Sequence, residues 1–185
     1  STNSDLWIVD IDGSNLKNIT TENLAYDGHA EYSPNGKYIA YTSQLIPGYE
    51  SDKWRLTIID TQSGKTTILS DEIDNHVNSF QWSLDSKSIY FDIDEKGYNP
   101  ILKIDLDDKK ITRILEKRSL HGFSLTPDNK SILFNYSFVD KPAEIAKLDL
   151  ESNKFSELTS FNKELLNDVD FRPAEQIWVD GSNGK

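Results

Sequence analysis

The amino-acid sequence predicts an all-β fold, a fragment of a β-propeller with about three to four four-stranded antiparallel blades. Two markers repeat along the chain with one period. In the first, an apolar strand ends in an aspartate, at positions 10, 60, 105 and 149, which are 50, 45 and 44 residues apart. In the second, a hydroxyl residue opens a turn, at Ser33, Ser83 and Thr126, which are 50 and 43 residues apart. Propeller blades recur with about this period, whereas a β-sandwich, the alternative, has no reason to repeat its sequence.

Each repeat is interpreted as two β-hairpins, because β-branched and aromatic residues flank pairs that tolerate a positive φ. These turn pairs are Asn35-Gly36, Asp85-Ser86, Asp128-Asn129, Asp12-Gly13, Ser63-Gly64 and Ser152-Asn153. The chain divides into a hairpin at 5–20, blades near 29–70, 77–116 and 121–159, and an exit segment at 160–185. In the exit segment we expect a short helix or turn within 161–169 and a last strand at 174–179. Trp7, Trp54, Trp82 and Trp178 are expected to pack between blades.

The blade count predicts an incomplete ring. Propellers usually have about four to eight blades, so we expect residues 1–185 to be the C-terminal part of a larger ring. Unpaired strand edges tend to pair with another chain. We therefore expect self-association through the open blade edges, or covering of those edges by the chain ends.

Composition excludes several classes of protein. The chain has 185 residues, with 20 Lys and Arg against 31 Asp and Glu, a net charge of −11. This acidity argues against nucleic acid as a partner. No apolar run is long enough to cross a membrane, and no signal peptide is visible. The absence of cysteine removes disulfides and thiolate chemistry, and it favours a cytoplasmic location.

A search for chemistry predicts no catalytic, cofactor-binding or metal-binding residue. The string Gly122-Phe123-Ser124-Leu125-Thr126 lacks the second glycine of a nucleophile elbow and leads into a strand. Gly64-Lys65-Thr66 lacks the earlier glycine of a phosphate loop, and the Asp10 and Asp92 strings fail the spacing of a calcium loop. The three histidines, His29, His76 and His121, each precede a blade, where convergence on one ion is difficult. We therefore assign them structural hydrogen bonds and expect no cofactor.

Two parts of the chain resemble a known family. The string Ser33-Pro34-Asn35-Gly36-Lys37-Tyr38-Ile39-Ala40 resembles the propeller repeat of prolyl oligopeptidase family peptidases and of the Tol-system periplasmic protein. The tail from Ala143 to Lys185 resembles the last blade and the exit into the hydrolase domain of acylaminoacyl-peptidase-like members. Leu84 and Ser86 depart from the usual Pro and Gly of the repeat, as Asn129 does from Gly, and these changes are expected to weaken the turns.

The resemblance implies that this chain is the non-catalytic propeller region of a serine peptidase. The propeller would gate and orient short peptide substrates for an α/β-hydrolase domain that lies outside residues 1–185 and holds the catalytic residues. A cytoplasmic location also agrees with this resemblance. The alternative is a Tol-system-like propeller that serves as a protein-interaction platform with no enzymatic role, because one fold hosts many functions.

Overall fold

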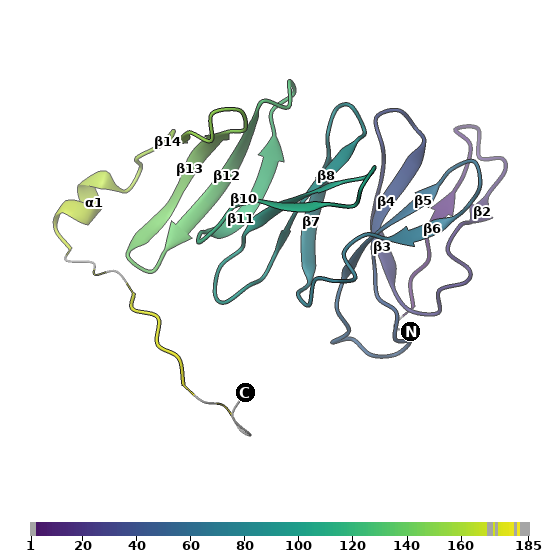
Figure 1. Ribbon diagram of the computed structural model, residues 1–185, viewed down its shortest axis with the longest axis horizontal. Coiled ribbons are helices and arrows are strands. Elements are labelled where there is room, and N and C mark those ends of the chain that lie inside the picture. The colour runs from purple at the N-terminus through teal and green to yellow at the C-terminus, as the bar shows by residue number, and fades with distance from the viewer. Residues whose placement is uncertain (1–2, 170–171, 173, 180, 182–185) are drawn as a thin grey trace.

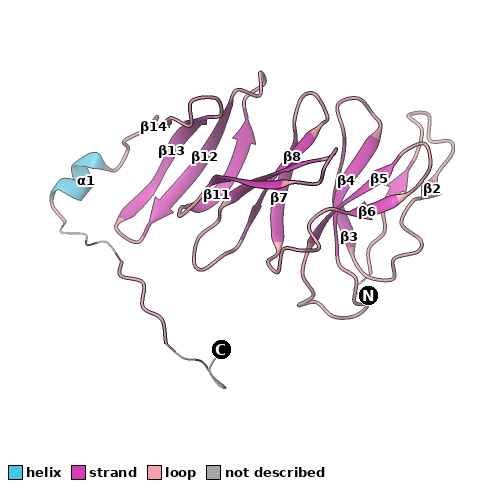
Figure 2. Cartoon of the chain, in the orientation of Figure 1, coloured by secondary structure: helices cyan, strands magenta, loops and turns pink. Residues whose placement is uncertain are grey.

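The computed structural model describes residues 3–169, 172, 174–179 and 181. Strands dominate the described chain (Figure 2). A two-stranded sheet, β1 (Trp7–Ile8) and β2 (Lys17–Asn18), comes first. Three four-stranded sheets follow, which we name blades 1, 2 and 3. Blade 1 comprises β3 (Asp27–Tyr32), β4 (Tyr38–Ser43), β5 (Arg55–Asp60) and β6 (Thr66–Ile68). Blade 2 comprises β7 (Val77–Trp82), β8 (Ser88–Ile93), β9 (Ile101–Asp105) and β10 (Ile111–Leu115). Blade 3 comprises β11 (Ser119–Leu125), β12 (Ser131–Phe138), β13 (Lys141–Asp149) and β14 (Phe155–Glu157).

Every blade is an antiparallel meander in which strands adjacent in sequence are also adjacent in the sheet. The blades stand side by side along the molecule, with the two-stranded sheet beyond blade 1 (Figure 1). The first strands β7 and β11 approach each other, which places the first strand of a blade at its inner edge. The predicted all-β fold of four-stranded antiparallel blades is confirmed.

The hydrophobic core lies between the blades. Along β8, Ile89 and Phe91 face blade 1, while Tyr90 faces blade 3, as the two-residue period of a strand requires. Blade 2 is therefore buried on both sides, and all six residues of β8 are buried. Trp82 stacks on Tyr38 of blade 1, with ring centroids 6.4 Å apart. This burial of apolar surface between sheets is the main force that holds the blades together.

The repeated hydroxyl motif is a hydrogen-bonded turn. Ser83 Oγ donates to Asp85 Oδ1 at 2.7 Å and accepts the N–H of Ser88 at 2.9 Å. Ser33 and Thr126 make the same pair of bonds in their own turns. The fourth residue of each turn, counted from the hydroxyl residue, is Gly36, Ser86 or Asn129 and has a positive φ of 70°, 60° or 55°, respectively. The turn chemistry predicted from the sequence is confirmed at all three positions.

The exit segment confirms one part of the sequence prediction and contradicts another. The short helix expected within 161–169 is present as α1 (Lys163–Asn167). The strand expected at 174–179 is wrong, because these residues have no ladder partner in the described part of the chain and lie in irregular structure. The packing predicted for Trp7 and Trp178 is also wrong, since their side chains are 57% and 73% exposed. No helix in the described part of the chain has the length and apolar character needed to cross a bilayer.

Candidate functional site

The blades present two different faces. The short hairpin turns, such as those at 33–37 and 83–87, form one face, which we call the turn face. The connections between blades form the opposite face together with the loops β4–β5 (44–54), β8–β9 (94–100) and β12–β13 (139–140). We call it the linker face. It runs along the lower edge of Figure 1, on the side where the chain continues beyond α1. The connections on the linker face are longer than the hairpin turns on the turn face.

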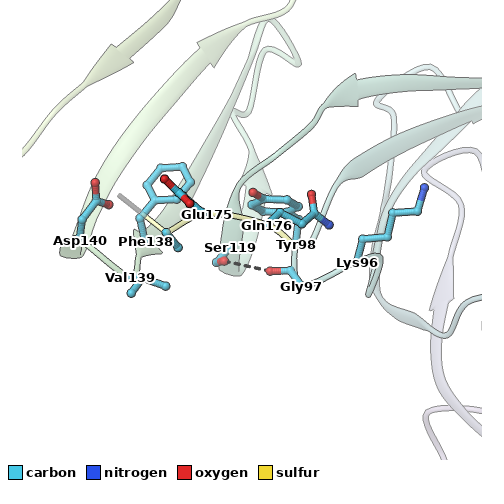
Figure 3. A pocket seen from close by; sticks show the side chains of 10 residues that line it. Lys96, Gly97, Tyr98, Ser119, Phe138, Val139, Asp140, Glu175 and Gln176 are labelled. Carbon is cyan, nitrogen blue, oxygen red and sulfur yellow. Dashed lines mark hydrogen bonds between the residues drawn. The ribbon is translucent and has the colours of Figure 1, made fainter. Parts of the chain in front are cut away.

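The exit segment returns to the linker face. Residues 174–176 line a cavity of about 450 Å³ together with the β8–β9 loop and the β12–β13 turn. Figure 3 shows Glu175 toward Phe138 and Gln176 toward Tyr98. Ser119 Oγ donates to the Gly97 carbonyl at 3.4 Å, which ties the β8–β9 loop to the start of blade 3. The exit segment thus crosses from blade 3 toward blade 2.

A second cavity adjoins the first and has charged walls. It measures about 390 Å³ and shares Lys96, Tyr98 and Gln176 with its neighbour. On its wall, Arg113 makes a bidentate ion pair with Glu95, with N–O distances of 2.8 and 2.9 Å. This guanidinium lowers the pKa of Glu95, so the carboxylate stays ionised at neutral pH.

The β4–β5 loop is organised around the buried carboxylate of Asp52. Its Oδ2 atom accepts the N–H groups of Leu45 at 2.6 Å and Ile46 at 3.0 Å, and it pairs with Arg55 at 3.2 Å. Burial acts to raise the pKa of Asp52, but these donors outweigh it and the pKa is lowered. Gln44 Nε2 donates to the carbonyl oxygens of Glu50 and Asp52 at 3.2 and 2.7 Å. These bonds tie the beginning of the loop to its second half.

This loop and the start of blade 1 enclose a cavity of about 270 Å³, which we call the aromatic cup. Its lining residues are Tyr26, Gln44, Ile46, Gly48, Tyr49, Glu50 and Trp54. The rings of Tyr26 and Trp54 meet edge to face, with centroids 4.9 Å apart. The sequence analysis missed this cup, because Tyr26 is distant in sequence from Tyr49 and Trp54.

The inner edge carries a register shift in the first strand of every blade. The shifts lie between Gly28 and Glu31, between Val77 and Ser79, and between Leu120 and Phe123. In blade 2, Asp92 Oδ1 accepts the N–H of Ser79 at 3.0 Å and so braces the bulge. A cavity of about 350 Å³ opens beside the first two bulges. Bulges bend a strand and re-aim its side chains, and residues of the first two bulges line this cavity.

The structure separates the three histidines that the sequence analysis considered together. His29 and His121 lie within the bulges of β3 and β11, while His76 lies just before β7. His76 Nδ1 accepts the N–H of Trp54 at 3.3 Å, and His121 Nε2 lies 2.7 Å from Ser137 Oγ. Within the described residues, no three potential metal-ligating side chains come together.

The other motifs weighed in the sequence lie in ordinary β-structure. Ser124 belongs to β11, not to a turn between a strand and a helix. Gly64 has a φ of 70° in the β5–β6 turn, where Asp60 Oδ1 accepts the N–H of Ser63 at 2.8 Å. Asp12 Oδ1 accepts the N–H of Ser14 at 2.9 Å, which is the turn capping expected of a short carboxylate.

No protein-family model matches the chain. Among known proteins, it is 29% identical to dipeptidyl-peptidase 5 of Porphyromonas gingivalis over 184 residues, which are 100% of this chain and 27% of that protein. It is 30% identical to dipeptidyl-peptidase 5 of Porphyromonas endodontalis, again over 100% of the chain and 27% of the relative. The chain therefore spans about a quarter of the length of these relatives.

Solved structures share the fold. The acylaminoacyl peptidase of Pyrococcus horikoshii aligns with a TM-score of 0.71 at 18% identity, over 90% of this chain and 24% of that one. The β-propeller domain of the Trilobed protease from Pyrococcus furiosus aligns with a TM-score of 0.66 at 19% identity, over 85% and 44%. TolB from Acinetobacter baumannii aligns with a TM-score of 0.61 at 20% identity, over 85% and 38%. At these identities the likeness establishes the propeller fold alone.

Proposed function

This chain is a β-propeller fragment of the prolyl oligopeptidase family, and we propose that it gates and orients short peptides for a hydrolase domain that packs on its linker face. The observation that carries the proposal is the path of the exit segment, which leaves blade 3 and returns along the linker face. The relatives named dipeptidyl-peptidase support a parent protein that is a peptidase.

The character of the linker face supports a docking role. Its loops and the exit segment expose a set of large apolar side chains: Leu45, Ile46, Tyr49, Val139, Ile177, Trp178 and Val179. A soluble domain rarely exposes so many apolar side chains on one face unless a partner covers them. The internal bonds of the β4–β5 loop hold part of this surface in place before docking. A partner domain would therefore meet a preformed surface.

Gating would act by steric exclusion and positioning. A lid of packed sheets admits short, flexible peptides and excludes folded chains. Peptides that enter are held near the reacting groups, which lowers the entropic cost of reaction. No residue of this chain is assigned a role in bond cleavage, so in our proposal the chemistry belongs to the hydrolase domain.

The proposal is tested in the parent protein by two apolar-to-acidic changes on the linker face, Ile46→Asp and Val139→Asp. Leu84→Asp is the matched control, because Leu84 is also an exposed apolar residue but lies on the turn face. We expect the linker-face variants to cleave long peptides relatively faster than dipeptide substrates, while the control retains the original ratio. An unchanged ratio in both linker-face variants would contradict gating.

The second candidate is a protein-interaction platform without enzymatic activity, because one fold hosts many functions and TolB shares this propeller fold. The two candidates differ in the parent protein. A serine-directed phosphonate should label the parent protein if it is a serine peptidase. It should leave the parent protein unlabelled if that protein is an interaction platform. Reading the coding sequence that follows Lys185 for a G-x-S-x-G motif between a strand and a helix distinguishes them independently.

A further inference from the structure

Two aromatic rings fill the boundary between blades 1 and 2 near the turn face. Tyr38, the first residue of β4, stacks on Trp82, the last residue of β7, with ring centroids 6.4 Å apart and an interplanar angle of 11°. Lys37 Nζ lies 5.0 Å from the centroid of the Tyr38 ring, within the range of a cation–π contact. At this level a ring therefore fits between two blades, with an apolar partner and an ammonium group beside it.

The boundary between blades 2 and 3 has the same backbone pattern but lacks both rings. Ser88 is the counterpart of Tyr38, because each begins the second strand of its blade and donates its N–H to the hydroxyl residue of the turn at 2.9 Å. Leu125 is the counterpart of Trp82, because each directly precedes that hydroxyl residue. Serine and leucine are smaller than tyrosine and tryptophan, so space remains between these two blades.

That space is a cavity of about 400 Å³, which we call the ring slot. Ser88 and Tyr90 of β8, Lys103 of β9, and the turns of blades 2 and 3 line it. Sites for small organic ligands span about 300–1,000 Å³. Asn129 also lines the slot, and it accepts a backbone N–H of blade 2 at 2.6 Å. This bond fixes the two turns relative to each other, so the slot is formed before any ligand arrives.

An ammonium group is fixed at the wall of the slot. Lys103 Nζ lies 2.7 Å from Asp105 Oδ1, and Ser88 Oγ donates to the same oxygen at 2.6 Å. The ammonium group also interacts electrostatically with Asp85, the acidic residue of the blade 2 turn. The slot therefore offers a ring the same kind of cation that accompanies the ring between blades 1 and 2.

The turns place ionised carboxylates at the slot. Asp85 and Asp128 both line it. Ser83 Oγ donates to Asp85 and Thr126 Oγ1 donates to Asp128, each at 2.7 Å, and these bonds lower the pKa of both carboxyl groups. Such carboxylates would repel an anionic ligand. An uncharged ring avoids this repulsion and leaves the ion pairs of the slot intact.

We propose that the ring slot binds an uncharged aromatic ring, in the position that corresponds to the ring of Tyr38 between blades 1 and 2. Two sources share this chemistry, a free aromatic molecule and the aromatic side chain of a peptide. The inference concerns the turn face and does not rest on the gating role, which belongs to the linker face. Its test uses the chain alone, so either proposal can fail while the other stands.

An NMR titration of the isotope-labelled chain with four probes tests the proposal. The probes are para-cresol, its saturated counterpart methylcyclohexanol, and two glycine peptides with blocked ends, one with a central tyrosine and one with a central leucine. We expect the amide signals of Ser88 and Asn129 to shift saturably with para-cresol or the tyrosine peptide, and not with the saturated or leucine probe. The aromatic probe that binds more tightly identifies the source. Equal binding of aromatic and aliphatic probes, or no shift at these two amides with any probe, overturns the proposal.

Two substitutions at one position separate filling of the slot from loss of a hydrogen bond. Ser88→Tyr introduces the residue of blade 1, and its ring should weaken binding of the aromatic probe about tenfold or more, because it leaves no room for the ligand. Ser88→Ala also removes the bond to Asp105 but adds no ring, so it should bind as the original chain does. Ser131→Tyr is the control, at the same position of blade 3, whose outer face no described blade covers. Equal binding by the two Ser88 variants would overturn the assignment of the slot.

A charge variant keeps the proposal testable if a tyrosine at position 88 prevents folding. Lys103→Met retains the length of the side chain and removes the ammonium group. We expect it to weaken binding about threefold, the effect of one partly exposed cation–π contact. Lys147→Met is the matched control, because Lys147 lies at the same position of blade 3 and outside the slot. Equal binding by the two variants would overturn the assignment of the slot.

Discussion

Asn129 joins two blades: its Oδ1 atom accepts the backbone N–H of Leu84 at 2.6 Å, across the boundary between blades 3 and 2. Blades 2 and 1 are joined in the same way, since Ser86 Oγ accepts the N–H of Asn35 at 3.1 Å. The donor is one residue later in blade 1 because Pro34, the counterpart of Leu84, has no N–H. Ser86 and Asn129, which replace the glycine of the repeat, thus each form a hydrogen bond to the preceding blade. The expectation that they only weaken the turns overlooked this bond.

This bond predicts the effect of substitutions at Asn129. Asn129→Ala should lower the free energy of unfolding by about 1–2 kcal/mol, because it removes an acceptor and because alanine tolerates a positive φ less well than asparagine. Asn129→Asp keeps the acceptor and should cost less than half as much. Chemical denaturation measures both. Asn153→Ala is the control, since Asn153 has the same φ of 55° in the β13–β14 turn. Equal losses at 129 and 153 would show that the bond between blades contributes nothing.

Asp27 predicts a pH dependence of stability. Its side chain is fully buried, Oδ1 accepts Asn23 Nδ2 at 2.8 Å, and Oδ2 has no hydrogen-bond partner among the described residues. Burial raises its pKa to about 6, although the hydrogen bond from Asn23 opposes the shift. Between about pH 4 and 6 the unfolded chain releases this proton while the folded chain keeps it. The contribution of Asp27 to stability is therefore full below pH 4 and is lost as the pH rises to 6.

Asp27→Asn should remove this dependence. We expect the variant to exceed the original chain in stability at pH 7 by about 2 kcal/mol, and to show no gain at pH 4. Urea denaturation at the two pH values measures the difference. Asp74→Asn, at an exposed position, is the control and should show neither effect. A variant that is no more stable than the original chain at pH 7 would contradict the assigned cause.

Gly28 and Tyr26 predict a coupled pair of substitutions. Because a Cβ at position 28 would lie 2.7 Å from the ring of Tyr26, Gly28→Ala should destabilise the chain by about 1–3 kcal/mol. The same change in a Tyr26→Leu background should cost clearly less. A double-mutant cycle from thermal denaturation measures the coupling. If the losses of stability from the two substitutions are additive, the ring of Tyr26 moves aside without an energetic cost, and the predicted coupling is wrong.

Glu144 predicts how firmly the exit segment is attached. The side chain is buried and accepts hydrogen bonds from Thr159 Oγ1 and from the backbone and side chain of Asn162. These donors lower the pKa of Glu144, so the contact is present above pH 4.5 and weakens in acid. Glu144→Ala should make trypsin cleave after Lys163 several times faster. Glu151→Ala, on the exposed β13–β14 turn, should leave the rate unchanged, and equal rates in both variants would refute the anchoring role.

The free edge of β1 predicts self-association. In the described structure β1 pairs only with β2, whereas its counterpart β5 pairs with strands on both sides. Trp7 and Val9 are exposed, while Thr57 and Ile59 at the matching positions are buried. Light scattering should detect dimers or larger species, and Trp7→Lys should shift them toward the monomer. A monomer at all concentrations would contradict this prediction.

The sequence by itself determined the features that depend on neighbouring residues. Runs of apolar, β-branched and aromatic residues that end in aspartate indicated the strands, and Ser33, Ser83 and Thr126 with the turn pairs after them indicated the hairpins. These signals act within about ten residues, so their repetition was sufficient to predict blades. The short helix within 161–169 was predicted for the same local reason.

Only the tertiary structure decided which of these similar segments are buried and which residues from distant segments meet. Residues 174–179 resemble a strand in sequence, but no described segment pairs with them, and strands depend on such partners for their hydrogen bonds. Trp82 is buried while Trp7 is exposed, because only Trp82 has an adjacent blade to cover it. The aromatic cup and the bond between Asn129 and Leu84 arise from contacts between residues far apart in sequence. The local sequence around each residue does not identify its partner.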